Sequence, residues 1–349
     1  MAFGIRHSAL VVLPYAPARD MAARSTQAKS LLPNAQCQMP DAVPNSCHGT
    51  FYRVHLSAMS DAEPWTVLRL LTWTTDYLKK AGVDEPRLAA EVLLAHVLGG
   101  QRIALYTRFD QAVEPQPRGC YRDLVKRAAA HEPIAYLVGQ REFYSLPIKV
   151  TPAVLIPRPE TELLVDVVLE CVKKEAAGRL WDACTGSGCV AVAAAHYATG
   201  LRVLATDISA EALAVARENV AQHSLAARVR VEQADLLSLP AEAAELCPFD
   251  VITANPPYVS AAQEADLPAV VLQEPRVALV AGENGCELVE RIIREAPPRL
   301  RPGGTLAVEM GMGQAGRVYD LLRQGGYEEI RILKDIAGIE RTAVARRPG

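Results

Sequence analysis

The chain has 349 residues, half of them apolar, and a formal net charge of -3 at pH 7. Its length exceeds that of one typical domain, and no apolar run approaches the roughly 18 to 20 residues of a membrane span. The slightly acidic balance argues against broad electrostatic capture of nucleic acid. The eight cysteines form no CxxC pair and no zinc-type cluster. We therefore expect two folded parts, no membrane segment, no metal, and free thiols in a reducing cytoplasm.

Residues 1–58 differ from the rest, because they combine scattered prolines and few acids with no helical period. We expect them to be unstructured. Three explanations compete: an Arg- and Ser-rich targeting peptide, a disordered extension, or a start codon assigned too far upstream. Met59-Ser60-Asp61 immediately precedes a helical pattern, which favours the upstream-start explanation. A transit peptide would instead make the protein mitochondrial.

Residues 59–139 are expected to form a small helical domain. Gly82 and Gly99-Gly100 divide this region by helix-ending signals. Three stretches share a helical period, at Leu68, Leu71, Thr75 and Leu78, at Ala90, Leu94 and Val97, and at Tyr121, Leu124, Val125 and Ala128. Facing apolar stripes of this kind indicate a helical bundle.

A change of pattern follows at residues 140–158, where aromatic and β-branched residues are interrupted by prolines, as in a β-hairpin connector. Residues 159–349 then alternate between strand and helix patterns, which predicts a doubly wound, Rossmann-like α/β domain. We expect helices from Glu160, over 188–198 and over 209–222. About seven strands are indicated, the last pair antiparallel, near 179–183, 202–206, 228–232, 249–254, 304–309, 328–333 and 342–346.

The first of these strands leads into the turn Asp182-Ala183-Cys184-Thr185-Gly186-Ser187-Gly188 and then into an Ala/Val-rich helix. Glycines at such a turn let a ligand approach the backbone, so a nucleoside-bearing ligand is indicated. The spacing departs from the GxGxxG dinucleotide pattern, because the third glycine is absent, and NAD is disfavoured. Taken alone, Gly186 and Gly188 could also be simple turn residues.

Three carboxylates follow strand ends near this turn. Asp207 ends the next strand about 20 residues on, where an acid accepts hydrogen bonds from ribose hydroxyls. Asp182 precedes the loop and could face the ammonium of a methionine moiety, although a helix-capping role is an alternative. Asp235, followed by Leu236, could accept a hydrogen bond from an adenine amino group, or could be a solvated loop acid.

The fourth strand delivers Asn255-Pro256-Pro257-Tyr258 to the carboxyl edge of the sheet, where open α/β domains bind ligands. The side-chain oxygen of Asn255 can accept one N–H of a planar nitrogen, and the Pro256 carbonyl can accept the other. The two prolines make this acceptor rigid, and Tyr258 offers a face for stacking. With the nucleoside loop, the tetrapeptide predicts an S-adenosylmethionine-dependent methyltransferase acting on a planar nitrogen.

Further segments resemble the PrmC/HemK family, the glutamine-N5 methyltransferases of peptide chain release factors. They are Pro133-Ile134-Ala135-Tyr136-Leu137-Val138-Gly139, Arg141-Glu142-Phe143-Tyr144 and Leu155-Ile156-Pro157-Arg158-Pro159-Glu160-Thr161-Glu162. The resemblance covers roughly 60 to 349. It implies a class I S-adenosylmethionine-dependent methyltransferase with a seven-stranded mixed sheet, preceded by a helical substrate-docking domain.

By this resemblance the substrate is the glutamine of the Gly-Gly-Gln tip of a release factor. Cys184 to Gly188 and Asp207 would contact the cofactor, Leu236 would lie against the adenine, and Asn255 to Tyr258 would hold the glutamine amide. Arg158, Glu160 and Thr161 would border the site, with helix capping an equal alternative for Thr161. Relatives usually carry glycine at position 184, and Cys184 departs from this.

Other occupants of the tetrapeptide remain open on the residues alone. A glutamine of a ribosomal protein and an exocyclic amino group of a base present the same planar nitrogen. The chain has no excess of positive charge, which favours a protein substrate and no sequence-specific binding of nucleic acid. A binding module that has lost its chemistry is a third possibility, against which the intact Asn255 and Tyr258 argue.

Overall fold

The computed structural model describes residues 64–172 and 177–349. All of these residues belong to one compact unit. The expectations for residues 1–58 lie outside the described part of the chain. None of the described helices is both long and apolar enough to cross a membrane.

The first described region is helical, as its apolar periods predict. Its helices are α1 (Val67–Lys80), α2 (Pro86–Val97), α3 (Arg102–Tyr106), α4 (Pro115–Ala129) and α5 (Ile134–Val138). Thr66 caps α1, because its side chain accepts a hydrogen bond from the backbone N–H of Arg69. The buried face of α1 is rotated from the expected one: Leu70 and Thr74 are buried with Leu71 and Leu78, whereas Leu68 is 43% exposed.

A short antiparallel hairpin follows, formed by β1 (Gln140–Phe143) and β2 (Leu146–Lys149). Phe143 and Ile148 are buried in the same hydrophobic core as Leu164 and Leu180. The fully buried side-chain amide of Asn219 accepts a hydrogen bond from the Lys149 N–H at 2.7 Å and donates to the Lys149 carbonyl at 3.0 Å. The same amide donates to the Ser187 carbonyl at 2.8 Å. The hairpin is thereby linked to the loop that follows the first strand of the large sheet.

The large sheet confirms the predicted fold class, with seven strands in the order β5-β4-β3-β6-β7-β9-β8. The first five strands in this order run parallel to one another, and β9 pairs antiparallel with both β7 and β8. The strands are β3 (Gly178–Ala183), β4 (Leu201–Asp207), β5 (Val229–Gln233), β6 (Phe249–Ala254), β7 (Leu300–Glu309), β8 (Glu328–Lys334) and β9 (Glu340–Arg346). The strand order reverses between β3 and β6, and ligands bind beyond the carboxyl ends of strands at such a point.

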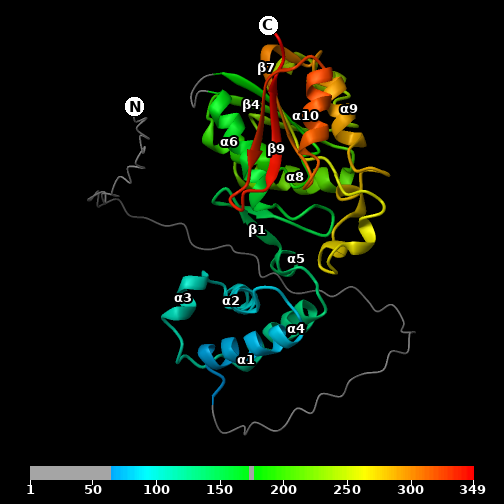
Figure 1. Ribbon diagram of the computed structural model, residues 1–349. Coiled ribbons are helices and arrows are strands. Elements are labelled where there is room, and N and C mark those ends of the chain that lie inside the picture. Colours follow the sequence, from blue (N-terminus) through cyan, green and yellow to red (C-terminus); the bar gives the residue numbers. More distant parts are fainter. Residues whose placement is uncertain (1–63, 173–176) are drawn as a thin grey trace, which may run out of the picture. The chain divides into compact units, whose positions relative to one another are not determined.

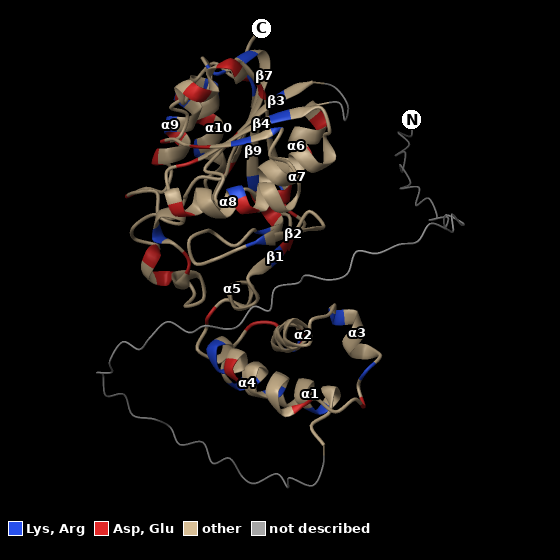
Figure 2. Ribbon diagram, turned by 180° about the vertical axis from the view of Figure 1, so that it is seen from behind, with Lys and Arg blue, Asp and Glu red and all other residues tan. Residues whose placement is uncertain are grey.

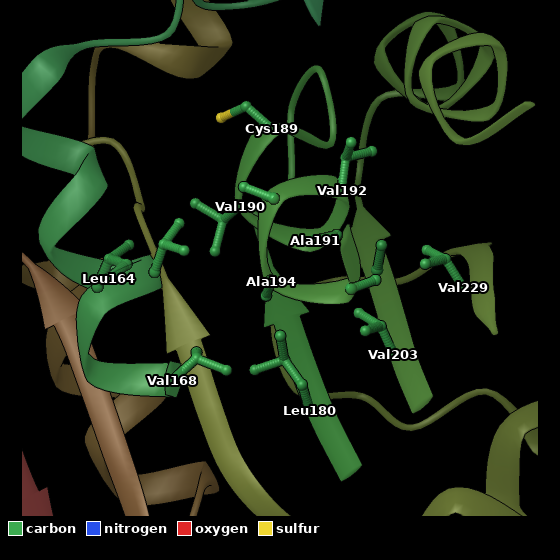
Figure 3. Close-up of a cluster of buried hydrophobic side chains, with 14 of the residues drawn as sticks. Leu164, Val168, Leu180, Cys189, Val190, Ala191, Val192, Ala194, Val203 and Val229 are labelled. Carbon is green, nitrogen blue, oxygen red and sulfur yellow. The ribbon is translucent and has the colours of Figure 1, made fainter. Parts of the chain in front are cut away.

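Helices cover both faces of this sheet (Figure 1). They are α6 (Glu162–Cys171), α7 (Cys189–Tyr197), α8 (Ala210–Gln222), α9 (Glu287–Glu295) and α10 (Ala315–Gln324). Alternating side chains of β3 supply the two cores: Leu180 packs with α6 and α7, whereas Trp181 packs with α9 and α10. Figure 3 shows the first core, with Leu164 and Val168 of α6 facing the Val/Ala-rich helix α7.

Two local features differ from the sequence-based expectation. The helix expected from Glu160 begins as a 3-10 turn at Pro159–Thr161 and becomes α-helical only at Glu162. Proline fixes the first residue of this turn and supplies no N–H. Helices α9 and α10 were not among the expected helices. Figure 2 shows that Lys and Arg positions are interspersed with Asp and Glu positions over the helices and strands of the described chain.

Candidate active site

A cavity of about 370 Å³ lies at the carboxyl ends of the parallel strands. Its lining includes most of the residues expected at the site, namely Asp182, Cys184, Thr185, Gly186, Ser187, Asp207, Asp235, Leu236, Asn255 and Pro257. Gly188, Pro256 and Tyr258 are not among the lining residues, although each adjoins one in the chain. The fold therefore brings the glycine loop and the start of the Asn-Pro-Pro-Tyr tetrapeptide to one cavity.

The loop between β3 and α7 has positive φ at every second position: Cys184 at 55°, Gly186 at 55° and Gly188 at 78°. A Cβ at Gly188 would lie 3.2 Å from the Cβ of Ala216 on α8, so this position also permits close helix packing. A Cβ at Gly186 would meet nothing within 4 Å. Cys184 holds the left-handed conformation despite its side chain, which is a strained state for a non-glycine residue.

Asp207 fixes this loop from the end of β4. One carboxylate oxygen accepts a hydrogen bond from the Gly186 N–H at 2.9 Å, and the other accepts one from the Ser209 N–H at 2.9 Å. Burial raises the pKa of Asp207, although these backbone hydrogen bonds oppose the shift. A carboxylate oxygen has further lone pairs, so Asp207 retains acceptor capacity toward the cavity.

Asp182 is almost completely buried at the end of β3, where it pairs in register with Thr253 of β6. Its oxygens accept hydrogen bonds from the hydroxyls of Thr185 at 2.6 Å and Thr253 at 2.8 Å. Burial raises its pKa to about 6, and both hydroxyls oppose the rise. The Asp182 carboxylate also accepts a hydrogen bond from the backbone N–H of Ala191, in the first turn of α7, which opposes the rise in its pKa. Asp182 therefore joins the glycine loop to both β6 and the start of α7, as the helix-capping alternative expects.

The third carboxylate, Asp235, lies past the end of β5 and forms a two-fold hydrogen-bonded ion pair with Arg291 of α9, at 3.1 and 3.3 Å. Leu236 follows in a left-handed conformation, with φ of 47°, and is 7% exposed. Both residues and Arg291 line the cavity. This end of the cavity thus combines an apolar wall with a paired acid, and Arg291 is a site residue that sequence reasoning missed.

The tetrapeptide is held by residues far along the chain. The Asn255 side-chain Nδ2 donates a hydrogen bond to the Thr161 hydroxyl at 3.2 Å. The side chain of Thr161 forms no capping hydrogen bond at the start of α6. The helix-capping alternative for Thr161 is therefore wrong. The Tyr258 carbonyl accepts a hydrogen bond from Gln314 Nε2 at 3.1 Å. A Cβ at Gly285 would lie only 2.5 Å from that carbonyl oxygen.

The segment before η1 (Pro159–Thr161) is fixed by a second buried acid. Glu274, 5% exposed, accepts a hydrogen bond from the Ile156 N–H at 3.0 Å and forms a salt bridge with Arg158. Arg158 lines the cavity. Sequence reasoning missed Glu274, Gln314 and Gly285, because nothing in their local pattern distinguishes them from surface loop residues.

Two family models match the chain. The PrmC N-terminal domain matches residues 69–139, and the methyltransferase small domain matches residues 161–283. The first range coincides with the described helices from α1 to α5, and the second contains the glycine loop and the tetrapeptide.

Relatives cover the chain more completely. Proteins named release factor glutamine methyltransferase are 44% identical over 82% of this chain and 98% of their own length in Rhodopirellula baltica, and 43% identical over 77% and 94% in Moorella thermoacetica. The solved catalytic domain of hMettl16, in complex with a MAT2A 3'UTR hairpin, matches with a TM-score of 0.51 at 20% identity, over 64% of this chain and 80% of that one, and shares the fold alone. The long, well-covered relatives show that the chain belongs to the release factor glutamine methyltransferase family.

Proposed function

We propose that this chain transfers a methyl group from S-adenosylmethionine to the side-chain amide nitrogen of the glutamine in the Gly-Gly-Gln motif of peptide chain release factors. The observation that carries the proposal is the shared cavity: Asn255 lines the same space as Gly186 and Asp207. Methyl donor and acceptor nitrogen must meet within van der Waals distance, and one cavity lined by both groups of residues allows this. The names of the well-covered relatives supply the substrate class.

The cofactor side of the cavity fits a nucleoside with an amino acid end. A Cβ at Gly186 would meet no protein atom within 4 Å, so backbone is exposed to a ligand there. Asp207 has spare acceptor capacity for ribose hydroxyls, and buried Leu236 offers an apolar surface for adenine. When bound, S-adenosylmethionine supplies a methyl group on a positively charged sulfur.

The acceptor side orients a weak nucleophile. The lone pair of an amide nitrogen is delocalised into its carbonyl group, so orientation matters more than a strong base. The Asn255 Oδ1 would accept one N–H of the glutamine and the Pro256 carbonyl the other, which directs the lone pair to the methyl group. Because Nδ2 of Asn255 donates to Thr161, its oxygen is the end available for the substrate.

The local environment favours loss of positive charge from the donor sulfur. Leu155, Leu236 and Val280 line the cavity with apolar surface, and a site poor in water favours a step that removes a charge. During transfer the nitrogen–carbon bond forms as the sulfur–carbon bond breaks, and the nitrogen then gives up one proton to solvent. An alkylated amide nitrogen is a strong acid, so this step needs no dedicated base.

Incubation with methyl-labelled S-adenosylmethionine and separate release factor, ribosome and DNA samples tests the proposal. We expect label in the release factor, and mass spectrometry should locate one added methyl group on the Gly-Gly-Gln peptide. Label in a ribosomal protein or in DNA, with none in the release factor, would replace the proposed substrate. Cofactor binding by calorimetry without transfer to any sample would identify a binding module.

A further inference from the structure

An acid with no well-formed hydrogen bond is buried beside the tetrapeptide. Glu309 ends β7 and is 0% exposed. Within residues 64–172 and 177–349, neither of its carboxylate oxygens has a hydrogen-bond partner of good geometry. Burying an unsatisfied carboxyl group is costly and rarely persists without a reason. The methyl transfer described above does not use Glu309, so its role is open.

The groups around Glu309 come from several elements. Burial raises its pKa to about 7; the Thr161 hydroxyl gives the largest opposing effect, Glu160 raises the pKa further, and Arg341 and Arg158 lower it. Arg341 is itself paired with Asp335 at 3.1 Å, and Glu160 lies 3.9 Å from it. The negative charge of Glu309 also raises the pKa of Tyr258 and of Cys189. Arg341 and Arg158 pair with Asp335 and Glu274, so within the described chain the Thr161 hydroxyl is the neighbouring donor without an acidic partner of its own.

Thr161 also contacts the tetrapeptide. It is 3% exposed, and its hydroxyl oxygen accepts the hydrogen bond from Asn255 Nδ2 at 3.2 Å. Ala254 pairs in register with Val308, so Asn255 and Glu309 are the next residues at the ends of the neighbouring strands β6 and β7. Glu309, Thr161 and Asn255 therefore form a cluster that begins in the core and ends at the cavity lining. Asn255 is the residue whose side chain must present an oxygen, and not an NH₂ group, to the substrate.

The donors and acceptors within this cluster determine which end of the amide faces the cavity. An ionised carboxylate only accepts hydrogen bonds, so a Thr161 hydroxyl that satisfies Glu309 directs its single proton toward that carboxylate. The Thr161 oxygen can then act only as an acceptor toward Asn255. The NH₂ end of Asn255 satisfies it, and the oxygen end would not. Asn255 Oδ1 is consequently turned toward the cavity.

We propose that Thr161, oriented by Glu309, is a positioning residue that fixes the direction of the Asn255 side-chain amide and so presents Oδ1 to the acceptor nitrogen. The part concerning the acceptor nitrogen rests on the proposed function, whereas the direction of the amide is a property of the protein alone. A protonated Glu309 can donate to Thr161, which frees the Thr161 proton to donate to Asn255. The amide then gains an alternative orientation with its NH₂ group toward the substrate, and productive binding decreases.

Kinetics of matched variants test this role. We expect Thr161→Val to lower kcat by about ten- to hundredfold, with the KM for S-adenosylmethionine nearly unchanged, and Thr161→Ser to restore most of the activity. Wild-type kcat should decrease as the pH falls through about 7, where Glu309 gains its proton. Glu309→Gln carries both a donor and an acceptor at every pH, so its kcat should be low and lack this pH step.

Thr74→Val is the matched control. Thr74 lies on α1, is fully buried, and has a hydroxyl without a hydrogen-bond partner of good geometry in the described chain. It does not line the cavity, so this variant should keep most of its kcat. Unchanged kcat in Thr161→Val, equal losses in Thr161→Val and Thr74→Val, or a wild-type pH step that persists in Glu309→Gln would each overturn the proposal.

A second measurement does not depend on the substrate. With nitrogen-15-labelled asparagine, the side-chain NH₂ signal of Asn255 can be assigned by its absence from Asn255→Ala. We expect this signal to shift across about pH 7 in the wild type and not in Glu309→Gln. A shift without methylation of release factors would reject the proposed substrate and keep the positioning role. Methylation with a pH-independent signal would reject the positioning role alone.

Discussion

The two sides of the cavity are built from different kinds of contact. On the cofactor side, hydrogen bonds join residues near strand ends, such as the Gly186 N–H to Asp207 and the Ser209 N–H to Asp207. On the transfer side, Asn255 depends on Thr161, 94 positions earlier, and the Tyr258 carbonyl depends on Gln314, 56 positions later. The glycine loop on the cofactor side therefore depends on strand-end geometry, whereas the transfer side depends on tertiary packing, as do the outer supports of the cofactor side, Thr253 and Arg291.

The largest effect that separates the two sides is expected from Asn255→Ala. Removing the amide removes the acceptor for the substrate N–H, so turnover should fall by about a hundredfold or more. Cofactor affinity should change little, because Gly186, Asp207 and Leu236 remain. Initial rates of methyl transfer and calorimetry with S-adenosylmethionine measure the two quantities. Asn284→Ala, at an exposed position, is the control, and equal turnover of both variants would contradict the role of Asn255.

A smaller effect on the same side is expected from Gly285→Ala. The new Cβ would lie 2.5 Å from the Tyr258 carbonyl oxygen, so the end of the tetrapeptide must move. We expect turnover to fall by about tenfold, since displacement of a positioned group is costly in rate. Cofactor affinity should again be nearly preserved.

Gly326→Ala provides the matched control for this variant. Gly326 has a φ of 75°, close to the 77° of Gly285, but a Cβ there would meet nothing within 4 Å. Both variants carry the same backbone strain, of about 1 kcal/mol, and only Gly285→Ala displaces Tyr258. If the two variants lost turnover equally, strain alone would account for the effect and Tyr258 would need no support from Gly285.

The same division explains what the sequence could predict. The α/β alternation, the glycine turn and the tetrapeptide each have a local pattern, because strand ends and turn conformations depend on neighbouring residues. The fold class was predicted correctly for this reason. The assignments of individual residues to cofactor or substrate stay predictions.

The supports of the transfer side were not predictable in this way. Glu274, Gln314 and Glu309 are single polar residues in unrelated segments, and their roles arise only when those segments pack together. The exposed Leu68 shows the same limit within a helix. Its spacing fits an apolar face, but the position of the neighbouring helices selects Leu70 and Thr74 as the buried residues.

The smallest expected effect concerns Cys184 on the cofactor side. Its φ of 55° lies in the left-handed region, where an L-residue with a Cβ is strained by about 1 to 2 kcal/mol. Cys184→Gly should remove this strain, offset by the greater freedom of glycine in the unfolded chain, about 0.5 to 1 kcal/mol. We expect a net gain of about 0.5 to 1 kcal/mol in the free energy of unfolding, measured by denaturant titration. Cys184→Ala keeps the Cβ and removes only the thiol, so it should show no gain. A gain of equal size in both variants would attribute the effect to loss of the buried thiol. Backbone strain at position 184 would then make no measurable contribution to the free energy of unfolding.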